Sequence, residues 1–301
     1  MKRRTVASIP AMLLAGSTAA EWEPAAAEAA VAKSPKIPDP STIPGGSSFE
    51  SPAVTTDNLP LFFEQLKNEL KYPLSWGTSQ IRDFRSWQAA ARGKVEEHLL
   101  QPPDDTPFNP LVVDELVTDS HVAQALVFNV TRHSRVRALA LTPHGDGPFP
   151  AVLLLHDHGA KFDIGKEKLI EPWGDETRHA SAVAWAAKYF SGRFVGNELA
   201  ARGYAVLAVD TLGWGDRSGM AYEGQQALAS NFFNLGSSLA GLMAREDVRA
   251  AALLAGLPKV DHNRVAALGF SMGGYRAWQV AALSDHVRVA VSACWMTTLA
   301  G

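Results

Sequence analysis

Cysteine is almost missing from this chain of 301 residues, in which Cys294 is the one example. A single thiol cannot close an intramolecular disulfide, and it cannot provide the cysteine clusters that hold metal ions. The neighbours of Cys294 are apolar, which predicts a buried and unreactive thiol. Disulfide stabilisation and cysteine-based metal chemistry are therefore excluded.

An excess of basic charge is missing as well. The chain carries 28 Lys and Arg against 31 Asp and Glu, a formal net charge of −3, so we expect no nucleic-acid partner. Hydrophobic residues make up 47% and charged residues 20%, which is typical of a globular protein with a sizeable core. The apolar run near the N-terminus is too short to cross a bilayer, so we expect no membrane span.

Residues 1–20 predict an export signal, because the basic residues 2–4 precede a short apolar run and then small residues. We therefore expect a secreted or periplasmic protein, and the pair Arg3-Arg4 leaves both the general secretory and the twin-arginine route open. Residues 21–54 are rich in Ala, Pro and Ser without apolar periodicity, which predicts a disordered leader.

Residues 55–110 predict a helical extension packed on the main domain. Apolar residues recur at helical spacing from Leu59 until Tyr72-Pro73, and a second helix is expected from Ile81 to Leu100. The aromatic residues of these helices could instead line a substrate cleft, but aromatic residues at helical spacing are more often part of a core.

Residues 111–301 read as alternating strands and helices. Strands are predicted at 111–118, 123–131, 136–142, 151–156, 205–210 and 287–293, and helices at 180–189, 195–202, 239–254 and 275–283. Ala151 to Leu155 is apolar without interruption, as in a strand buried on both faces at the centre of a sheet. This alternation predicts an α/β fold with a doubly wound, mostly parallel sheet and sites at the carboxyl ends of its strands.

A Gly-x-Ser-x-Gly pattern at Gly269–Gly273 lies between an apolar strand and a helix. In such an elbow the serine sits on a strained turn that projects its hydroxyl above the sheet, which makes Ser271 the candidate nucleophile. The glycines are needed where strand and helix approach closely.

Four motifs in order carry a resemblance to a known family. The first is the strand that ends in the His-Asp-His-Gly sequence of residues 156–159, and the second is the strand that ends at Asp210 with the loop to Ser218. The third is the segment 260–264 before the elbow strand, and the fourth is the elbow at 269–274. Residues 112–301 thereby resemble the α/β-hydrolases, and most of all the secreted bacterial esterases related to dienelactone hydrolase and acetyl xylan esterase.

The resemblance implies a serine esterase without a cofactor. Ser271 would attack the ester, and the oxyanion would be stabilised by the N–H of Met272 and by one N–H from the loop of His158, Gly159 and Ala160. The serine also needs a histidine as base and an acid to orient it, and in this fold both follow the serine in the chain.

The chain after Ser271 contains one acid, Asp285, and one histidine, His286. The helix between them and the serine rises about 1.5 Å per residue, so His286 should lie on the order of 13 Å away, on the surface at the opposite edge of the sheet. We therefore expect a hydrolase domain that is incomplete at its C-terminus and lacks the last strands of the fold. Residues 287–293 would then form an exposed edge through which the chain could self-associate.

Several polar residues at the strand ends allow other interpretations. His156 or His158 could substitute as the base, although a His-Gly pair here more often shapes the oxyanion loop. A metal site on these two histidines with Asp157 or His179 is less favoured, since no second clear ligand pair is present. We expect Asp210 and Asp216 to brace their loop by hydrogen bonds. The three lysines within residues 161–168 should form a solvated face or a charged rim for an acidic or carbohydrate substrate, and they are Lys161, Lys166 and Lys168.

The sequence thus predicts a secreted serine esterase that acts through an acyl-enzyme, with acyl esters of carbohydrates or similar small esters as favoured substrates. The alternative is a catalytically incomplete or non-catalytic protein with the same fold. A third possibility is an enzyme that acts on peptides or lactones through the same serine.

Overall fold

The structure, a computed structural model, describes residues 55–56, 59–60 and 63–295. The predicted export signal and leader lie outside these residues. The chain divides into two compact units, residues 1–66 and 67–301. In the first unit β1 (Thr55–Thr56) pairs antiparallel with β2 (Leu59–Pro60). The helix α1 (Phe63–Glu69) begins in this unit and ends in the second. The helix predicted from Leu59 therefore begins later, because a proline at position 60 disfavours helical backbone at the residue before it.

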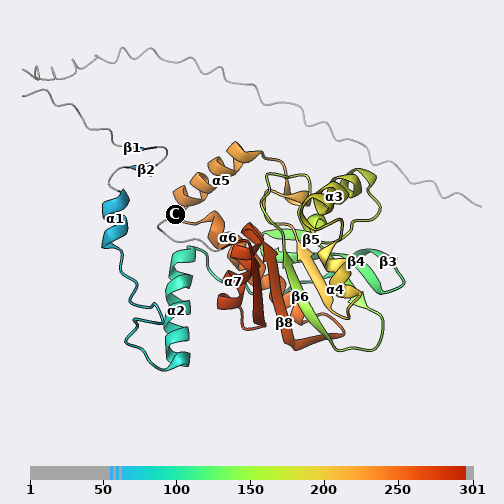
Figure 1. The fold of residues 1–301 in the computed structure, drawn as a ribbon, viewed down its shortest axis with the longest axis horizontal. Coiled ribbons are helices and arrows are strands. Elements are labelled where there is room, and N and C mark those ends of the chain that lie inside the picture. Colours follow the sequence, from blue (N-terminus) through green and yellow to red (C-terminus); the bar gives the residue numbers. More distant parts are fainter. Residues whose placement is uncertain (1–54, 57–58, 61–62, 296–301) are drawn as a thin grey trace, which may run out of the picture. The chain divides into compact units, whose positions relative to one another are not determined.

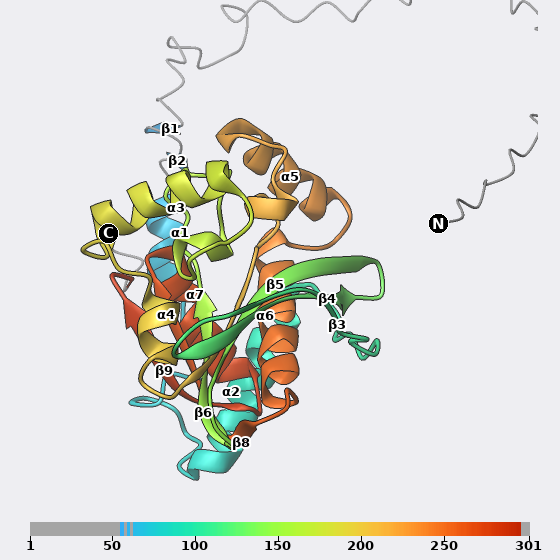
Figure 2. The ribbon, with the colours of Figure 1, turned by 90° about the vertical axis from the view of Figure 1, so that its right-hand side faces the viewer.

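The second unit contains one seven-stranded sheet (Figures 1 and 2). Its order is β3 (Leu111–Val117), β4 (His121–Thr131), β5 (Ser134–Pro143), β7 (Ala205–Val209), β6 (Phe149–Leu155), β8 (Val260–Phe270) and β9 (Val287–Ala293). Strands β7, β6, β8 and β9 pair in parallel, whereas β3, β4, β5 and β7 pair antiparallel. The predicted α/β class is confirmed, with an antiparallel part preceding the parallel one.

The uninterrupted apolar runs form the middle of the sheet, as predicted. Leu153 of β6 lies opposite Leu207 of β7 and Ala267 of β8, and all three are fully buried. Such strands need cover on both faces, because a solvated face would require alternating polar residues.

Helices cover both faces of the sheet. On one face α6 (Leu239–Ala255) and α7 (Met272–Leu283) pack against the core that includes Leu153 and Leu207. On the other face α4 (Val195–Ala200) packs against Val206 and Ala208. The helix α3 (Glu176–Tyr189) precedes α4 and is capped by Asp175, whose carboxylate accepts the N–H of Arg178.

The second predicted N-terminal helix is α2 (Phe84–Leu99), which is bonded to α6 and α7. Arg92 Nε donates to the carbonyl of Ala282 at 2.8 Å, and the hydroxyl of Ser238, the N-cap of α6, donates to the carbonyl of Leu99 at 2.7 Å. Among the helices of the described residues, none combines the length and apolarity needed to cross a bilayer.

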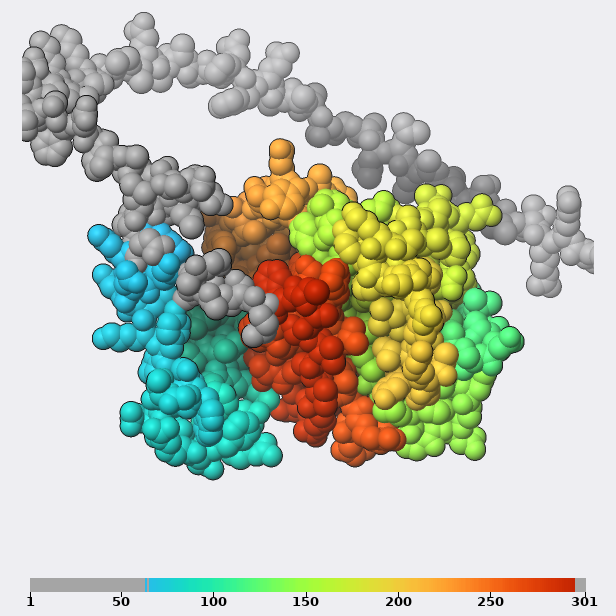
Figure 3. Space-filling model, in the orientation of Figure 1, coloured from blue at the N-terminus to red at the C-terminus, as the bar shows by residue number. Residues whose placement is uncertain are grey.

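The strand β9 and Cys294, near the C-terminal end of the described residues, are both exposed. The segment of α7 and β9 (red) reaches the surface between α2 and the region of α3 and α4 (Figure 3). Val289 and Val291 of β9 are 57% and 47% exposed, in line with the predicted edge strand. Cys294 is exposed, so the prediction of a buried thiol is wrong. The chain turns out of β9 at this residue, where φ is 58°, and this turn takes the side chain away from the core.

Candidate functional site

The parallel strands bring four chain segments to one edge of the sheet. β6, β7, β8 and β9 run in the same direction, so the loops after Leu155, Val209, Phe270 and Ala293 all begin at their carboxyl ends. This is the edge at which open α/β sheets bind ligands. Polar residues that lie far apart in the sequence therefore meet here.

Ser271 forms the turn from β8 into α7. Its backbone has φ 54° and ψ −123°, a combination that L residues rarely adopt and that costs of order 1–3 kcal/mol. The turn is held by its N–H, which donates to the carbonyl of Ala293 at 2.8 Å, and by its carbonyl, which accepts the N–H of Gly274 at 2.7 Å. The residue is half-buried, so the serine is held in a strained conformation at a partly solvent-accessible position.

Close packing explains the two glycines of the motif. A Cβ on Gly269 would collide with the carbonyl group of Gly273, and a Cβ on Gly273 would collide with the carbonyl of Leu155. The first turn of α7 therefore rests directly on the ends of β8 and β6. Any larger side chain would push the helix away from the sheet and open the turn at Ser271.

His156 follows β6 and is fully buried. Its Nδ1 lies 2.9 Å from the carbonyl of Asp157, and its Nε2 accepts the N–H of Thr211 at 3.1 Å. Because Nε2 is an acceptor, the ring is neutral and Nδ1 carries the proton. Burial, together with the positive charge of Arg276, holds the pKa of His156 well below its usual value. Both ring nitrogens are engaged, so His156 is not free to serve as a base.

His158 is engaged in the same way. Its Nδ1 accepts the N–H of Ala160 at 3.1 Å, which leaves Nε2 to donate to Oε1 of Gln225 at 3.0 Å. The imidazole contacts the ring of Trp214 edge to face, with centroids 4.9 Å apart. Of the three predicted oxyanion residues in this loop, Ala160 therefore has its N–H bonded to a side chain. The N–H groups of His158 and Gly159 make no hydrogen bond within the described residues.

Comparisons with known proteins agree with this arrangement. Residues 189–295 match the Dienelactone hydrolase family. The "Putative hydrolase YtaP" of Bacillus subtilis (strain 168) is 30% identical over 193 residues, which are 64% of this chain and 59% of that protein. The crystal structure of a "putative acetyl xylan esterase" from Bacteroides fragilis NCTC 9343 superposes with a TM-score of 0.55 at 17% identity, over 75% of this chain and 57% of the other.

The chain has the α/β-hydrolase fold. It resembles the dienelactone hydrolase family in the segment that contains β7, β8, the Ser271 turn and β9. It spans 59% of the length of the curated relative that it matches.

In an α/β-hydrolase the acid and the histidine follow the serine in the chain. Asp285 and His286 are exposed and lie beyond the end of α7, a helix of 12 residues that is about 18 Å long and begins at the serine turn. Asp285 forms an ion pair with Arg92 at 2.5 Å. The structure thus places His286 on the surface before β9, as predicted, and these two residues cannot complete a triad with Ser271.

The remaining histidines of the chain also lie elsewhere. His98 is in the last turn of α2, His121 begins β4, and His262 is near the start of β8. His133 lies between β4 and β5, and His144 follows β5. His179 lies on α3, with its Nε2 3.2 Å from Glu171. The less favoured alternative, a metal site on His156 and His158 with Asp157 or His179, finds no support in the structure, because the ring nitrogens of both imidazoles bond to protein groups.

Lys166 and Lys168 correct the prediction of a solvated lysine face. Lys161 is partly exposed, but Lys166 and Lys168 are 1% and 0% exposed. The Nζ of Lys166 lies 2.6 Å from Asp210, 2.8 Å from Asp216 and 2.9 Å from Glu167. Burial opposes the charge, but these carboxylates, Asp210 first, raise the pKa of Lys166 above its usual value. The lysines are buried because their charges are paired there.

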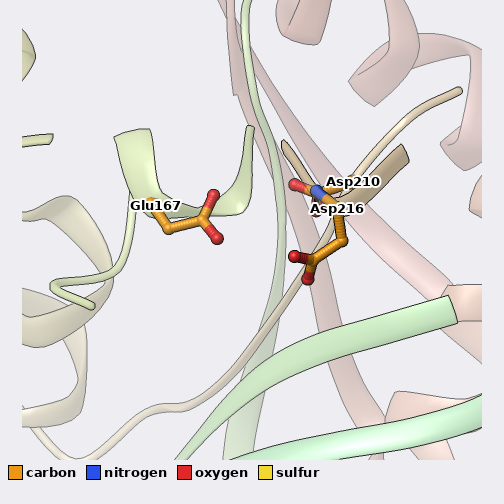
Figure 4. Close-up of side chains that lie close together, drawn as sticks. All are labelled: Glu167, Asp210 and Asp216. Carbon is orange, nitrogen blue, oxygen red and sulfur yellow. Dashed lines mark hydrogen bonds between the residues drawn. The ribbon is translucent and has the colours of Figure 1, made fainter. Parts of the chain in front are cut away.

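Glu167, Asp210 and Asp216 are also the one group within the described residues whose carboxylates could together hold a metal ion (Figure 4). The Lys166 ammonium already lies among them, and Arg178 contacts both Glu167 and Asp216. Asp210 further accepts the backbone N–H groups of Lys166 and Asp216 at 2.7 and 3.0 Å, so it braces its loop as predicted. The group is therefore a structural ion cluster, in which the cations Lys166 and Arg178 lie among the three carboxylates.

The sequence interpretation missed a buried ion pair beside the serine. Arg276 of α7 binds Asp247 of α6 through two hydrogen bonds of 2.8 and 2.7 Å, and its Nη1 donates to the carbonyl of His156 at 3.2 Å. The available signal was an arginine, the one charged residue of the predicted helix 275–283. Its partner could not be identified from sequence, because it lies 29 residues earlier in the chain.

Proposed function

We propose that this α/β-hydrolase cleaves carboxylic esters with Ser271 as the nucleophile, through an acyl-enzyme. The observation that carries the proposal is the strained backbone of Ser271 at the carboxyl end of β8, with α7 packed on the strand ends. Proteins keep such strain where the surrounding structure enforces it, and a serine presented in this way is the arrangement of a nucleophile elbow.

The oxyanion would be bound by backbone N–H groups. The N–H of Met272 lies in the first turn of α7, where backbone donors have no acceptor within the helix and the helix dipole favours negative charge. A second donor would come from His158 or Gly159. Ala160 would first have to break its bond to His158 Nδ1. Each such donor typically lowers the barrier by about 3 kcal/mol.

Small acyl esters, including those of carbohydrates, are the proposed substrates. The rings of Trp185 and Tyr189 of α3 make a tilted contact with centroids 4.4 Å apart, and the Tyr189 ring lies 5.9 Å from that of Phe270, the residue before the serine. Tyr189 is 41% exposed, which leaves an aromatic surface that suits the apolar face of a sugar ring. We also propose that residues 1–20 direct export of the protein and that residues 287–293 mediate its self-association.

The test compares the 301-residue chain with Ser271→Ala on p-nitrophenyl acetate. We expect the variant to lose at least about 10³-fold in kcat, since removal of the nucleophile leaves only binding and oxyanion contributions. Ser230→Ala, at an exposed serine of α5 (Tyr222–Asn234), is the matched control and should keep the full rate. Equal rates for the chain and for Ser271→Ala would refute the proposal.

A second candidate is a hydrolase fold without catalysis. It is favoured by the ring nitrogens of His156 and His158, which are all engaged, and by the distant position of His286. Under this alternative Ser271 has no base to take its proton, and the equal-rate outcome is the expected one.

A further inference from the structure

Lys168 is a buried cation that contacts the loop of the proposed oxyanion donors. Its Nζ lies 3.1 Å from the carbonyl of Asp157, 3.1 Å from the carbonyl of His158 and 3.3 Å from Oδ2 of Asp157. It also lies 4.6 Å from the centre of the Trp185 ring. A buried ammonium costs several kcal/mol unless such contacts are made, so the geometry of the loop and the charge of Lys168 depend on each other.

The orientation of the two carbonyls fixes the orientation of two N–H groups. In a trans peptide the carbonyl of one residue and the N–H of the next point in opposite directions. Because the carbonyls of Asp157 and His158 both point to Lys168, the N–H groups of His158 and Gly159 point away from it. Successive N–H groups on one side of the chain form a concavity suited to an anion, and Gly159, with φ 54°, supplies the left-handed backbone typical of such a loop.

A second donor holds the same peptide. The Nε1 of Trp214, a buried residue after β7, donates to the carbonyl of His158 at 3.0 Å. Lys166, the other buried lysine of this segment, instead holds the loop after β7 through Asp210 and Asp216. Contact with the carbonyls of residues 157 and 158 therefore distinguishes Lys168 from its neighbour.

We propose that Lys168 is the positioning residue that aims the N–H groups of His158 and Gly159 at the oxyanion of the ester. The inference rests on the proposed function of Ser271. Lys168 is fully buried, so it acts on the reaction through the loop and does not touch the substrate. Its contribution should appear in the transition state, where the oxyanion forms, and not in ground-state binding.

The test is Lys168→Met, which keeps the apolar stem and removes the ammonium. We expect kcat on p-nitrophenyl acetate to fall by about 10- to 100-fold with KM changed by less than about 3-fold, since small displacements of catalytic groups cost up to about 10²-fold. Lys94→Met removes an exposed lysine of α2, paired with Glu97 at 2.6 Å, and should keep the full rate.

Loss of the ammonium also leaves Asp157 buried without its cation, and Oδ1 of this carboxylate has no hydrogen bond within the described residues. The double variant Lys168→Met/Asp157→Asn removes that charge and should fold with the same loss in kcat. Trp214→Phe deletes the other donor to His158 and should lower kcat by about 3- to 10-fold at unchanged KM. If neither Lys168 variant folds, the kcat of Trp214→Phe tests the proposal in their place.

The outcomes separate the two proposals. Equal rates for the chain and Ser271→Ala overturn the esterase and this inference together, because no oxyanion then forms. A large loss in Ser271→Ala combined with an unchanged kcat in the folded Lys168 variants, or in Trp214→Phe where these do not fold, overturns the inference alone. A rise in KM at constant kcat also overturns it, because that result means that Lys168 affects ground-state binding.

Discussion

Replacement of Arg276 by methionine should destabilise the hydrolase unit strongly. Arg276 and Asp247 are 1% and 4% exposed, and the guanidinium donates two hydrogen bonds to the carboxylate and one to the carbonyl of His156. Arg276→Met removes all three bonds and leaves a carboxylate buried without a cation. Such a change costs about 3–5 kcal/mol, a large part of the roughly 5–15 kcal/mol by which a domain of this kind is stable.

The double variant Arg276→Met/Asp247→Leu should recover most of the loss. It removes the orphaned charge and fills the space with apolar groups, and replacement of a buried ion pair in this way is often neutral. A residual loss of about 1–3 kcal/mol is expected from the carbonyl of His156, which no longer has its donor. The recovery separates the cost of an unpaired charge from the net worth of the pair.

The assay is urea unfolding followed by tryptophan fluorescence, with the free energy of unfolding extrapolated to water. Arg202→Met is the matched control, because Arg202 pairs with Glu198 at 2.6 Å on the surface and such pairs contribute about 0–1 kcal/mol. A loss below about 1 kcal/mol in Arg276→Met would refute the reasoning. So would a double variant as unstable as the sum of the two single variants.

Two further predictions concern pH and association. Burial lowers the pKa of His156, so below about pH 6.5 the unfolded chain binds a proton that the folded chain does not. The free energy of unfolding should therefore decline as the pH falls from about 6.5 to 5, by up to about 1.4 kcal/mol per pH unit. His156→Asn should flatten this slope in urea titrations while His286→Asn, at an exposed histidine, keeps it, and an unchanged slope in His156→Asn would contradict the neutral assignment. We expect the chain to self-associate through the exposed edge of β9, and Val289→Lys should abolish this association. Size exclusion with light scattering measures it, and a wild-type chain that is monomeric at every concentration would contradict the prediction.

The parts of the fold that could be predicted are those whose signal is local. Ala151–Leu155 and Ala205–Val209 are continuous apolar runs, and they form the two central strands because only a strand covered on both faces tolerates that composition. The helix α5 (Tyr222–Asn234) was missed, and none of its residues is buried. A helix without a buried face leaves no strong apolar period in the sequence.

The parts of the site that could not be predicted depend on partners distant in the chain. Ser271 was found because Gly269 and Gly273 are dictated by packing within a few residues of it. The sequence alone predicts that Lys166 and Lys168 are solvated, because a lysine is rarely buried without a pair. Asp210, the partner of Lys166, lies 44 residues away, and the sequence shows no sign of the contact.

Three of the four buried cations in the described part of this unit lie at the carboxyl edge of the parallel strands. The fourth, Arg249 of α6, donates to the carbonyls of Val130, Asp104 and Thr106 instead. Lys168 and Arg276 hold carbonyls at the end of β6, and Lys166 holds Asp210 at the end of β7. Buried ion pairs add little net stability compared with apolar packing, so a search for stability alone gives no reason to gather them at one edge of the sheet. Their contacts do fix backbone direction in the loops beside Ser271, and a preorganised oxyanion site requires that direction to be fixed before the substrate arrives. The cations at the carboxyl edge are therefore better explained as supports for the loops around Ser271 than as contributions to the core.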